Sequence, residues 1–204
     1  MQARCQARWP GKALRRVTKR VEVRPVTPGR WGDLEKLFGP SGAYGGCWCM
    51  YFRMRSAENA RAKGSERKAA MKALVESGQP PGLLAYVDDV PAGWVSLDAR
   101  ERFTMLQYSR MYKPVDDAPV WTIVCFVVGK KYRRQGLMAE LLNGAARWAR
   151  ENGARALEAY PDEPDGELKG YAGYMGIRPV FDRAGFREVA RLKNGRPVMR
   201  RRLE

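Results

Sequence analysis

One stretch of the chain, a strand followed by a basic turn and a helix, limits the possible folds more than any other. The run VWTIVCFVV at 120–128 is uninterrupted and apolar, which is typical of a strand buried on both faces. The basic turn GKKYRRQG follows, and an amphipathic helix is predicted over about 134–151. The next predicted strand, ARALEAYP at 154–161, makes the stretch a parallel β-α-β unit.

The remaining elements extend this unit into a mixed sheet with helices on its faces. Apolar alternation and turn residues predict the element order β-α-α-β-β-β-α-β-α-β-β. The other predicted strands cover 21–26, 82–99 as a pair, 186–192 and 196–203, and the other predicted helices cover 27–38, 65–78 and 178–185. Pro197 suits an edge strand or the first positions of a strand, because proline cannot donate to a sheet ladder. Residues 41–55 and 100–119 are predicted to be connections.

Composition restricts the class of protein and its chemistry. The chain has 204 residues, 45% of them hydrophobic, so one globular domain with a real core is expected at 21–204. No apolar run reaches the length of a membrane span. The sequence has no histidine, which excludes Ser-His-Asp and Cys-His nucleophilic sites and removes the usual zinc ligand.

Charge and cysteine content bear on the partner and the compartment. The formal net charge of +16 suits a nucleic acid, an anionic membrane or a polyanionic cofactor. Residues 1–20 hold seven basic and no acidic residues, so we expect a flexible basic tail, with a nucleic-acid contact as the alternative. The four cysteines form no regular disulfide framework, so a reducing compartment, the cytoplasm, is expected.

The turn at 129–136 has the physical features of a phosphate site. A strand that turns tightly into a helix points unpaired backbone N–H groups at one place, and the helix dipole adds partial positive charge. Gly136 permits close approach of a ligand. The basic side chains of the turn are Lys130, Lys131, Arg133 and Arg134. The turn is neither a Walker A loop nor G-x-G-x-x-G. Taken alone, it fits a pyrophosphate site and a solvated basic turn equally well.

The segment YRRQGLM resembles the Arg/Gln-x-x-Gly-x-Gly/Ala signature of the GNAT superfamily of acyl-CoA-dependent N-acyltransferases. Arg133 matches the first position and Gly136 the first glycine, whereas Met138 replaces the final small residue. The flanking strand and helix strengthen the resemblance, as does FDRAGF at 181–186, which resembles the family's Tyr-x-x-x-Gly-Phe segment. The resemblance covers about 21–204 and implies an α/β fold whose mixed, mostly antiparallel sheet has splayed parallel central strands.

The resemblance also implies that acetyl-CoA is the co-substrate and lies between the strands at 120–128 and 154–160. Its pantetheine arm would pair with strand backbone, and its pyrophosphate would rest on the amides of the turn. The residues implied for this role are Phe126, Val127, Val128, Arg133, Arg134, Gln135, Gly136, Leu137 and Met138. The N–H of Phe126 or Val127 would donate to the developing oxyanion.

The family's usual positions for a catalytic acid and base hold unsuitable residues. The glutamate base that many relatives carry on the preceding strand is Thr122 here, and the usual tyrosine acid is Phe181. Glu158, on the strand beside the expected opening, is the candidate base, with a water relay as the alternative. Tyr174 is the preferred candidate acid, and the other two are Tyr171 and Tyr160, which shares a strand face with Glu158. The alternative for each is an ordinary packing or ion-paired residue.

The acceptor pocket is expected in the irregular segment GCWCMYFR, between the first two helices. The resemblance implies that Trp48, Tyr51 and Phe52 line it, and aromatic packing over the core is the alternative. The C-x-C pair in this segment is a weak zinc motif without histidine, so no metal is predicted. The acidic run at 162–167 is either a hydrophilic loop or an attraction for a cationic amine.

We therefore expect an N-acetyltransferase that moves an acetyl group from acetyl-CoA to a primary amine by direct attack in a ternary complex. The acceptor is expected to be a small molecule or a peptide, and no membrane contact is expected. The alternative is a GNAT-fold protein with little or no catalysis that binds nucleic acid or ribosomes through its basic surface. The basic tail and the missing tyrosine at position 181 motivate that alternative.

Overall fold

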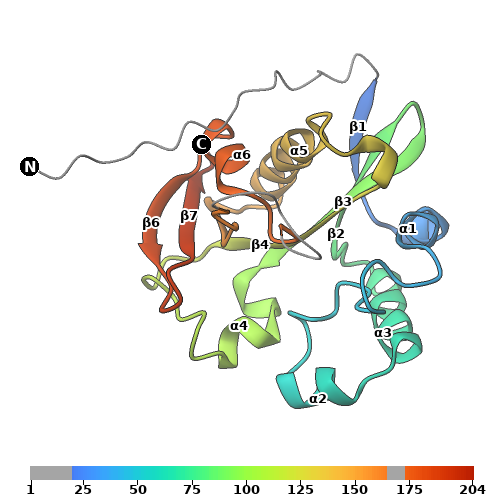
Figure 1. The fold of residues 1–204 in the computed structure, drawn as a ribbon, viewed down its shortest axis with the longest axis horizontal. Helices are drawn as coiled ribbons and strands as arrows, with labels where there is room; N and C mark the ends of the chain where they lie inside the picture. Colours follow the sequence, from blue (N-terminus) through green and yellow to red (C-terminus); the bar gives the residue numbers. More distant parts are fainter. Residues whose placement is uncertain (1–19, 165–172) are drawn as a thin grey trace, which may run out of the picture.

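The computed structural model describes residues 20–164 and 173–204, and these residues form a seven-stranded mixed sheet flanked by helices (Figure 1). The strand order is β1-β2-β3-β4-β5-β7-β6. The strands are β1 (Val21–Pro25), β2 (Gly82–Val87), β3 (Val90–Ala99), β4 (Trp121–Val128), β5 (Ala156–Ala159), β6 (Arg187–Arg191) and β7 (Pro197–Arg202). Strands β4 and β5 pair in parallel, and the other neighbouring strands pair antiparallel. The predicted mixed, mostly antiparallel sheet is confirmed.

Helices cover both faces of this sheet. They are α1 (Trp31–Phe38), α2 (Ser56–Arg61), α3 (Gly64–Glu76), α4 (Thr104–Tyr108), α5 (Leu137–Glu151) and α6 (Arg178–Arg183), with 3-10 turns η1 (Pro28–Arg30), η2 (Arg100–Arg102) and η3 (Lys130–Tyr132). Helices α5 and α6 pack on one face, and α1 and α3 pack on the other (Figure 1). Within the described part of the chain, no helix has the length and apolar character that a membrane span requires.

Helix α5 forms where the amphipathic pattern predicted it, but it begins at Leu137 because Gly136 takes the N-cap position in a left-handed conformation. Its apolar side is buried against the sheet; the buried leucines and alanines are Leu137, Leu141, Leu142, Ala145, Ala146 and Ala149. Each leucine buried in this way stabilises the fold by about 1.5–3 kcal/mol. Gly144 lets β1 approach the helix, since a Cβ there would lie 2.5 Å from Val23.

Two short helices, α2 and α4, were not predicted. Both are too short for helical periodicity to be visible in the sequence. Helix α4 depends on tertiary contacts: Leu106 is buried, and the Met105 N–H donates to the Phe52 carbonyl at 3.0 Å. Pro197 was predicted to lie either on an edge strand or at the start of a strand. The edge alternative is wrong, because β7 lies inside the sheet and β6 is the edge. Pro197 is tolerated as its first residue.

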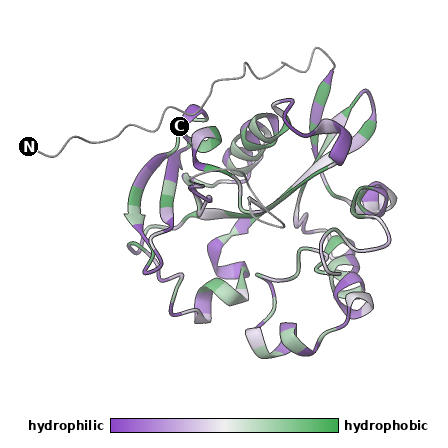
Figure 2. Cartoon of the chain, viewed as in Figure 1, coloured by the Kyte–Doolittle hydropathy of each residue, from purple (hydrophilic) through white to green (hydrophobic). Residues whose placement is uncertain are grey.

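Among the described residues, the core consists of three clusters, and the third lies on the face of β4 opposite α5. The first cluster lies between the sheet and helices α5 and α6, and the second between the sheet and helices α1 and α3. The third joins residues far apart in sequence: Phe52, Phe103, Leu106, Val124, Tyr160, Met175, Leu192 and Val198. In Figure 2, β2 is mostly hydrophobic, whereas the β6–β7 hairpin mixes hydrophilic and hydrophobic residues. The predicted tail at 1–20 lies outside the described residues, apart from Arg20.

Candidate active site

The parallel pairing of β4 with β5 is short and ends in the middle of β4. Its last pair is Ile123 with Ala159. On the other side of β4, the register with β3 shifts at Val124, which has no partner residue in β3. A bulge of this kind bends a strand and redirects its backbone groups. Beyond the bulge, the Phe126 N–H donates a hydrogen bond to the Tyr174 carbonyl at 2.6 Å. This N–H therefore faces the opening between the two parallel strands and not β3.

The turn from β4 into α5 has an ordered backbone with free space above it. Gly136 has φ of 87°, and a Cβ at this position would meet nothing within 4 Å. Arg133 Nε donates to the Val128 carbonyl at 3.2 Å, and the Gln135 amide donates to the Lys131 carbonyl at 2.6 Å. Among the described residues, the N–H groups of Leu137 and Met138 at the start of α5 have no backbone acceptor, whereas the Ala139 N–H donates to the Gly136 carbonyl at 2.9 Å. These groups, the helix dipole and the open space fit a bound pyrophosphate.

The side chains of this turn point to different surroundings. Its four basic residues, Lys130, Lys131, Arg133 and Arg134, are all exposed to solvent. Leu137 is buried, and Met138 packs against the core cluster beneath α5. Met138 stands where the family signature has a small residue. Because its side chain contacts the core, it does not fill the ligand side of the turn.

A buried carboxylate, Glu158, lies on β5 at the base of the opening. Its side chain is 1% exposed and accepts hydrogen bonds from Arg200 Nε at 2.7 Å and from the Tyr160 hydroxyl at 2.5 Å. Arg100 Nε forms an ion pair with it at 3.7 Å. Burial raises the pKa of Tyr160 well above its ordinary value. Thr122 is the parallel partner of Glu158, and its buried hydroxyl has no hydrogen-bond partner among the described residues. The predicted pair of Glu158 and Tyr160 is thus in direct contact, within an ionic network.

Aromatic side chains from three separate segments meet on the face of β4 opposite α5. The Tyr112 ring meets Phe52 edge-on at 5.8 Å and Tyr160 at 5.0 Å. Tyr51 packs on Phe52 at 5.2 Å and is 42% exposed. Tyr174 is half-buried in the same region, and burial raises the pKa of both Tyr174 and Tyr112. Two of the three predicted acceptor residues, Tyr51 and Phe52, therefore lie together beside the predicted catalytic tyrosines.

Trp48, the third predicted acceptor residue, lies in a different cluster. It is buried and contacts Trp31 at 5.9 Å and Phe38 at 5.5 Å. Its other side borders an open groove of about 730 Å³ between α1 and the start of α3. The groove is lined by Glu35, Lys36, Gly39, Pro40, Gly46, Trp48, Gly64, Ser65 and Lys68. The structure does not bring Trp48 together with Tyr51 and Phe52.

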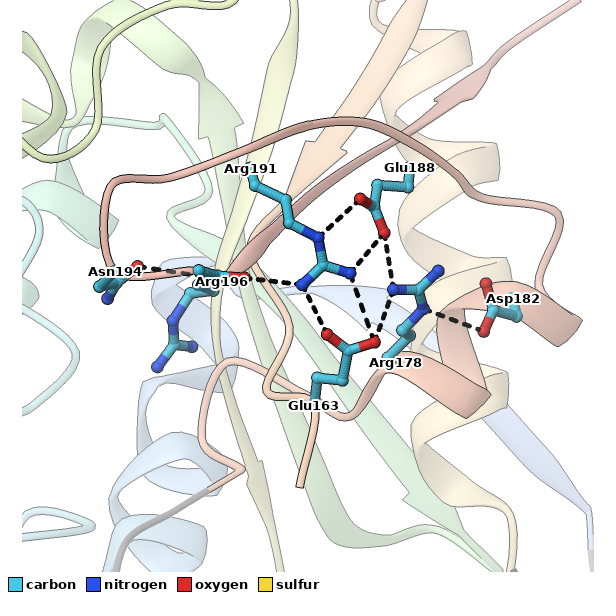
Figure 3. A network of polar contacts seen from close by, with 8 residues as sticks. Glu163, Arg178, Asp182, Glu188, Arg191, Asn194 and Arg196 are labelled. Carbon is cyan, nitrogen blue, oxygen red and sulfur yellow. Dashed lines mark hydrogen bonds and ion pairs between the residues drawn. The ribbon is translucent and has the colours of Figure 1, made fainter. Parts of the chain in front are cut away.

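The acidic segment after β5 is neutralised by arginines, as Figure 3 shows. Glu163 pairs with Arg178 at 2.6 Å and with Arg191 at 2.7 Å, and Glu188 pairs with both arginines. Asp162 pairs with Arg196 at 2.6 Å. Arg191 is the largest cause of the lowered pKa of Glu163. Asp165, Glu167 and Tyr171, another candidate acid, lie outside the described residues. The two described carboxylates therefore bind the segment to α6 and the β6–β7 hairpin and leave little unpaired negative charge for an amine.

The sequence of the chain matches the family model described as "Acetyltransferase (GNAT) family" over residues 48–169. The chain belongs to the GNAT acetyltransferase family. It is accordingly a GNAT N-acetyltransferase. No curated protein sequence matches it.

Solved structures share the fold of the enzyme at low sequence identity. A GNAT-family acetyltransferase from Streptococcus agalactiae 2603 has a TM-score of 0.55 and 11% identity, over 90% of this chain and 96% of that one. The putative acetyltransferase YncA from Salmonella typhimurium, solved with acetyl-CoA, has a TM-score of 0.53 and 16% identity, over 90% and 94%. The aminoglycoside N-acetyltransferase AAC(6')-Iy, in complex with CoA, has a TM-score of 0.52 and 14% identity, over 85% and 91%.

The residue at the family's usual tyrosine position does not face the opening of the enzyme. Phe181 is fully buried and packs edge-on against Phe126 at 6.1 Å and against Phe186 at 5.0 Å. Its ring also lies 2.4 Å from where a Cβ on Gly176 would be, so Gly176 permits this packing. Position 181 in the enzyme is a core residue and has no proton to donate.

Sequence reasoning missed Tyr112, Arg100 and Arg200 as members of this site. Tyr112 lies in the connection at 100–119, where no periodicity marks it. Arg200 lies in a run of three arginines whose members are equivalent in the sequence. Its pairing is set by the register of β7, in which Arg200 is opposite Glu158. Of the three missed residues, only Arg200 could have been found from the sequence. If the predicted hairpin is paired with β5, cross-strand pairing limits which arginines can contact Glu158.

Proposed function

We propose that the enzyme transfers an acetyl group from acetyl-CoA to a primary amine by direct attack in a ternary complex. The main observation in support is the Phe126 N–H, which the bulge at Val124 turns into the opening between β4 and β5. An N–H fixed by a strand can donate to a carbonyl oxygen placed there without reorganisation during the reaction. In the free enzyme, the Tyr174 carbonyl occupies this donor, and we propose that the substrate carbonyl oxygen replaces it.

The proposed cofactor site combines strand backbone with the turn before α5. Acetyl-CoA, when bound, supplies an activated acetyl thioester. We propose that backbone groups of Phe126, Val127 and Val128 hold its pantetheine arm. The remaining proposed residues hold the pyrophosphate: Arg133, Arg134, Gln135, Gly136, Leu137 and Met138. Free space above Gly136 and the unpaired amides at the start of α5 support this assignment.

For proton transfer, we propose that Tyr174 acts as the acid. The Tyr174 carbonyl accepts the Phe126 N–H, which places this residue at the opening, and its hydroxyl is protonated at neutral pH. Glu158 and Tyr160 are bound to each other and to two arginines. These contacts favour a positioning role for the pair over the base role predicted for Glu158. We propose that the proton of the amine leaves to water.

The acceptor is proposed to lie against Tyr51, Phe52 and Tyr112, on the face of β4 opposite α5. Trp48 was predicted for the same pocket, and in the enzyme it borders the groove at α1 and α3 instead. The proposed acceptor class remains an amine on a small molecule or a peptide.

The proposal is tested by an acetyl-CoA turnover screen over aminoglycosides, polyamines, amino acids and peptides, with thiol release as the readout. We expect release with one class, and initial-velocity lines that intersect when both substrates are varied. Parallel lines would contradict direct attack in a ternary complex. CoA should also raise the melting temperature of the enzyme. A melting temperature that does not change in millimolar CoA would contradict the proposed cofactor site.

A further inference from the structure

Two thiols contact each other across the acceptor side of β4. Cys49 Sγ lies 3.3 Å from Cys125 Sγ, although the two residues are 76 positions apart in the sequence. Cys49 is buried and accepts a hydrogen bond from Trp94 Nε1 at 3.1 Å. Cys125 is half-buried, and both thiols are free. The pair lies between the second and third core clusters, next to the predicted transfer site.

Two local irregularities of the backbone bring these thiols together. Trp48 and Cys49 have φ of 45° and 53°, in the left-handed region that such residues rarely adopt. The Trp48 ring is fixed by packing against Phe38, and this packing holds the turn. On β4, the bulge at Val124 places two consecutive side chains, Val124 and Cys125, on the side away from α5.

We propose that Cys49 and Cys125 form a reversible dithiol–disulfide pair whose oxidation slows acetyl transfer. With hydrogen peroxide as the oxidant, the Cys125 thiolate attacks one peroxide oxygen, giving a sulfenic acid, and the departing hydroxide gains a proton to become water. The Cys49 sulfur then displaces the hydroxyl group, forms the S–S bond, and a second water leaves. Two thiols thereby lose two electrons and two protons, and the peroxide is reduced to two waters. A thiol reductant restores the dithiol by exchange.

The surroundings of the two thiols fit these separate roles. Cys125 is partly accessible, so a small peroxide can reach it first. The hydrogen bond to Cys125 and burial raise the pKa of the Cys49 thiol, so Cys49 is not the first to attack the peroxide. Cys47 is also free, and its raised pKa and its hydrogen bond to the Gly42 carbonyl keep it protonated.

Disulfide formation would move the strand that carries the proposed oxyanion donor. An S–S bond is about 2 Å long, so oxidation shortens the present contact by more than about 1 Å. Cys125 directly precedes Phe126, and a displacement of about 1 Å near a reacting group can slow catalysis roughly 100-fold. This coupling rests on the proposed function, whereas formation of the disulfide does not.

The test treats the full-length enzyme with peroxide, then blocks free thiols and maps tryptic peptides without reduction. We expect a crosslink between the peptide that ends at Arg53 and the peptide that ends at Lys130. Because the first peptide also contains Cys47, the mapping is repeated in Cys47→Ser, which should retain the crosslink. Cys49→Ser and Cys125→Ser should each lose it. Two variants are used because Cys49 is buried and its replacement can affect folding, whereas Cys125 is half-buried.

Acetyl transfer is measured on the same samples. We expect oxidation to lower the rate roughly 10- to 100-fold, dithiothreitol to restore it, and Cys49→Ser to keep its rate in peroxide. A crosslink that leaves the rate unchanged, or an equal loss in Cys49→Ser, would overturn the proposal. Absence of the crosslink would overturn it whether or not an acceptor is found. Conversely, a screen without any acceptor refutes the proposed function. The peptide map then still shows whether Cys49 and Cys125 form the disulfide, and the CoA-induced melting shift, measured with and without peroxide, shows whether the disulfide alters the cofactor site.

Discussion

The two sides of β4 are built in different ways. On the cofactor side, one continuous segment supplies the proposed contacts, and most of them are backbone groups between Phe126 and Met138. On the acceptor side, the contacts are side chains from separate segments: Phe52, Arg100, Tyr112, Glu158, Tyr174 and Arg200. A site made of backbone tolerates changes of side chain, whereas a site made of side chains changes its chemistry with each substitution. One fold can in this way keep a common cofactor and vary the acceptor.

The largest expected effect concerns the buried carboxylate of the acceptor side. Replacing Glu158 with Gln leaves Arg200 and Arg100 without their buried counter-charge, so we expect a loss of about 3 kcal/mol in the free energy of unfolding. Urea denaturation measures it. Glu140→Gln, an exposed carboxylate of α5, is the matched control and should change stability little. A loss below about 1 kcal/mol in Glu158→Gln would mean that the network is no more than a surface ion pair.

A smaller effect is expected in catalysis when the proposed acid is removed. Tyr174→Phe should lower kcat roughly 100-fold and leave KM for acetyl-CoA unchanged, because an acid acts in the chemical step. The wild-type rate should persist to alkaline pH and fall only above the ordinary tyrosine value, since burial raises the pKa of Tyr174 and only its protonated form donates. The variant should lack this alkaline fall. Tyr108→Phe, which is 67% exposed, is the control. An equal kcat loss in both variants would exclude Tyr174 as the acid.

The backbone of the cofactor side is tested by two glycines at opposite ends of α5. Gly136 and Gly153 have φ of 87° and 85°, and an added Cβ would meet nothing within 4 Å at either position. Alanine at each should therefore cost similar backbone strain. We expect Gly136→Ala alone to weaken acetyl-CoA binding, roughly tenfold, by calorimetric titration. Equal affinities in the two variants would place the pyrophosphate elsewhere.

The smallest expected effect concerns the exposed ionic cluster of Figure 3. The pKa of Glu163 is lowered chiefly by Arg191, so its stabilisation is present above the ordinary glutamate value and is lost as pH falls through the lowered one. Glu163→Gln should cost less than about 1 kcal/mol at pH 7, because the group is partly exposed and screened. Melting temperatures at neutral and acidic pH, with low and high salt, measure it. A difference that persists in acid would contradict an electrostatic origin.

The same contrast explains how much could be predicted from the sequence. The strand, turn and helix of the cofactor side are local, so apolar periodicity and Gly136 were sufficient to predict them. The sheet and the element order followed, except for α2 and α4, which are too short to show periodicity. The contact between Tyr160 and Glu158 was accessible from strand alternation. Tyr112, Arg100 and the partner of Cys125 depend on long-range packing, for which a single sequence has no signal.

The unmatched residue Val124 also determines which side chains share a face on each half of β4. Side chains of a regular strand alternate between faces, yet Ile123 and Phe126 both contact the core under α5, although they are an odd number of positions apart. If β4 ran regularly through Val124 without the bulge, strict alternation would reverse the facing of every later residue of the strand. Cys125 would then point toward α5 and Phe126 toward the acceptor. The single extra residue in β4 thus determines which side chains face the core under α5 and which face the proposed acceptor.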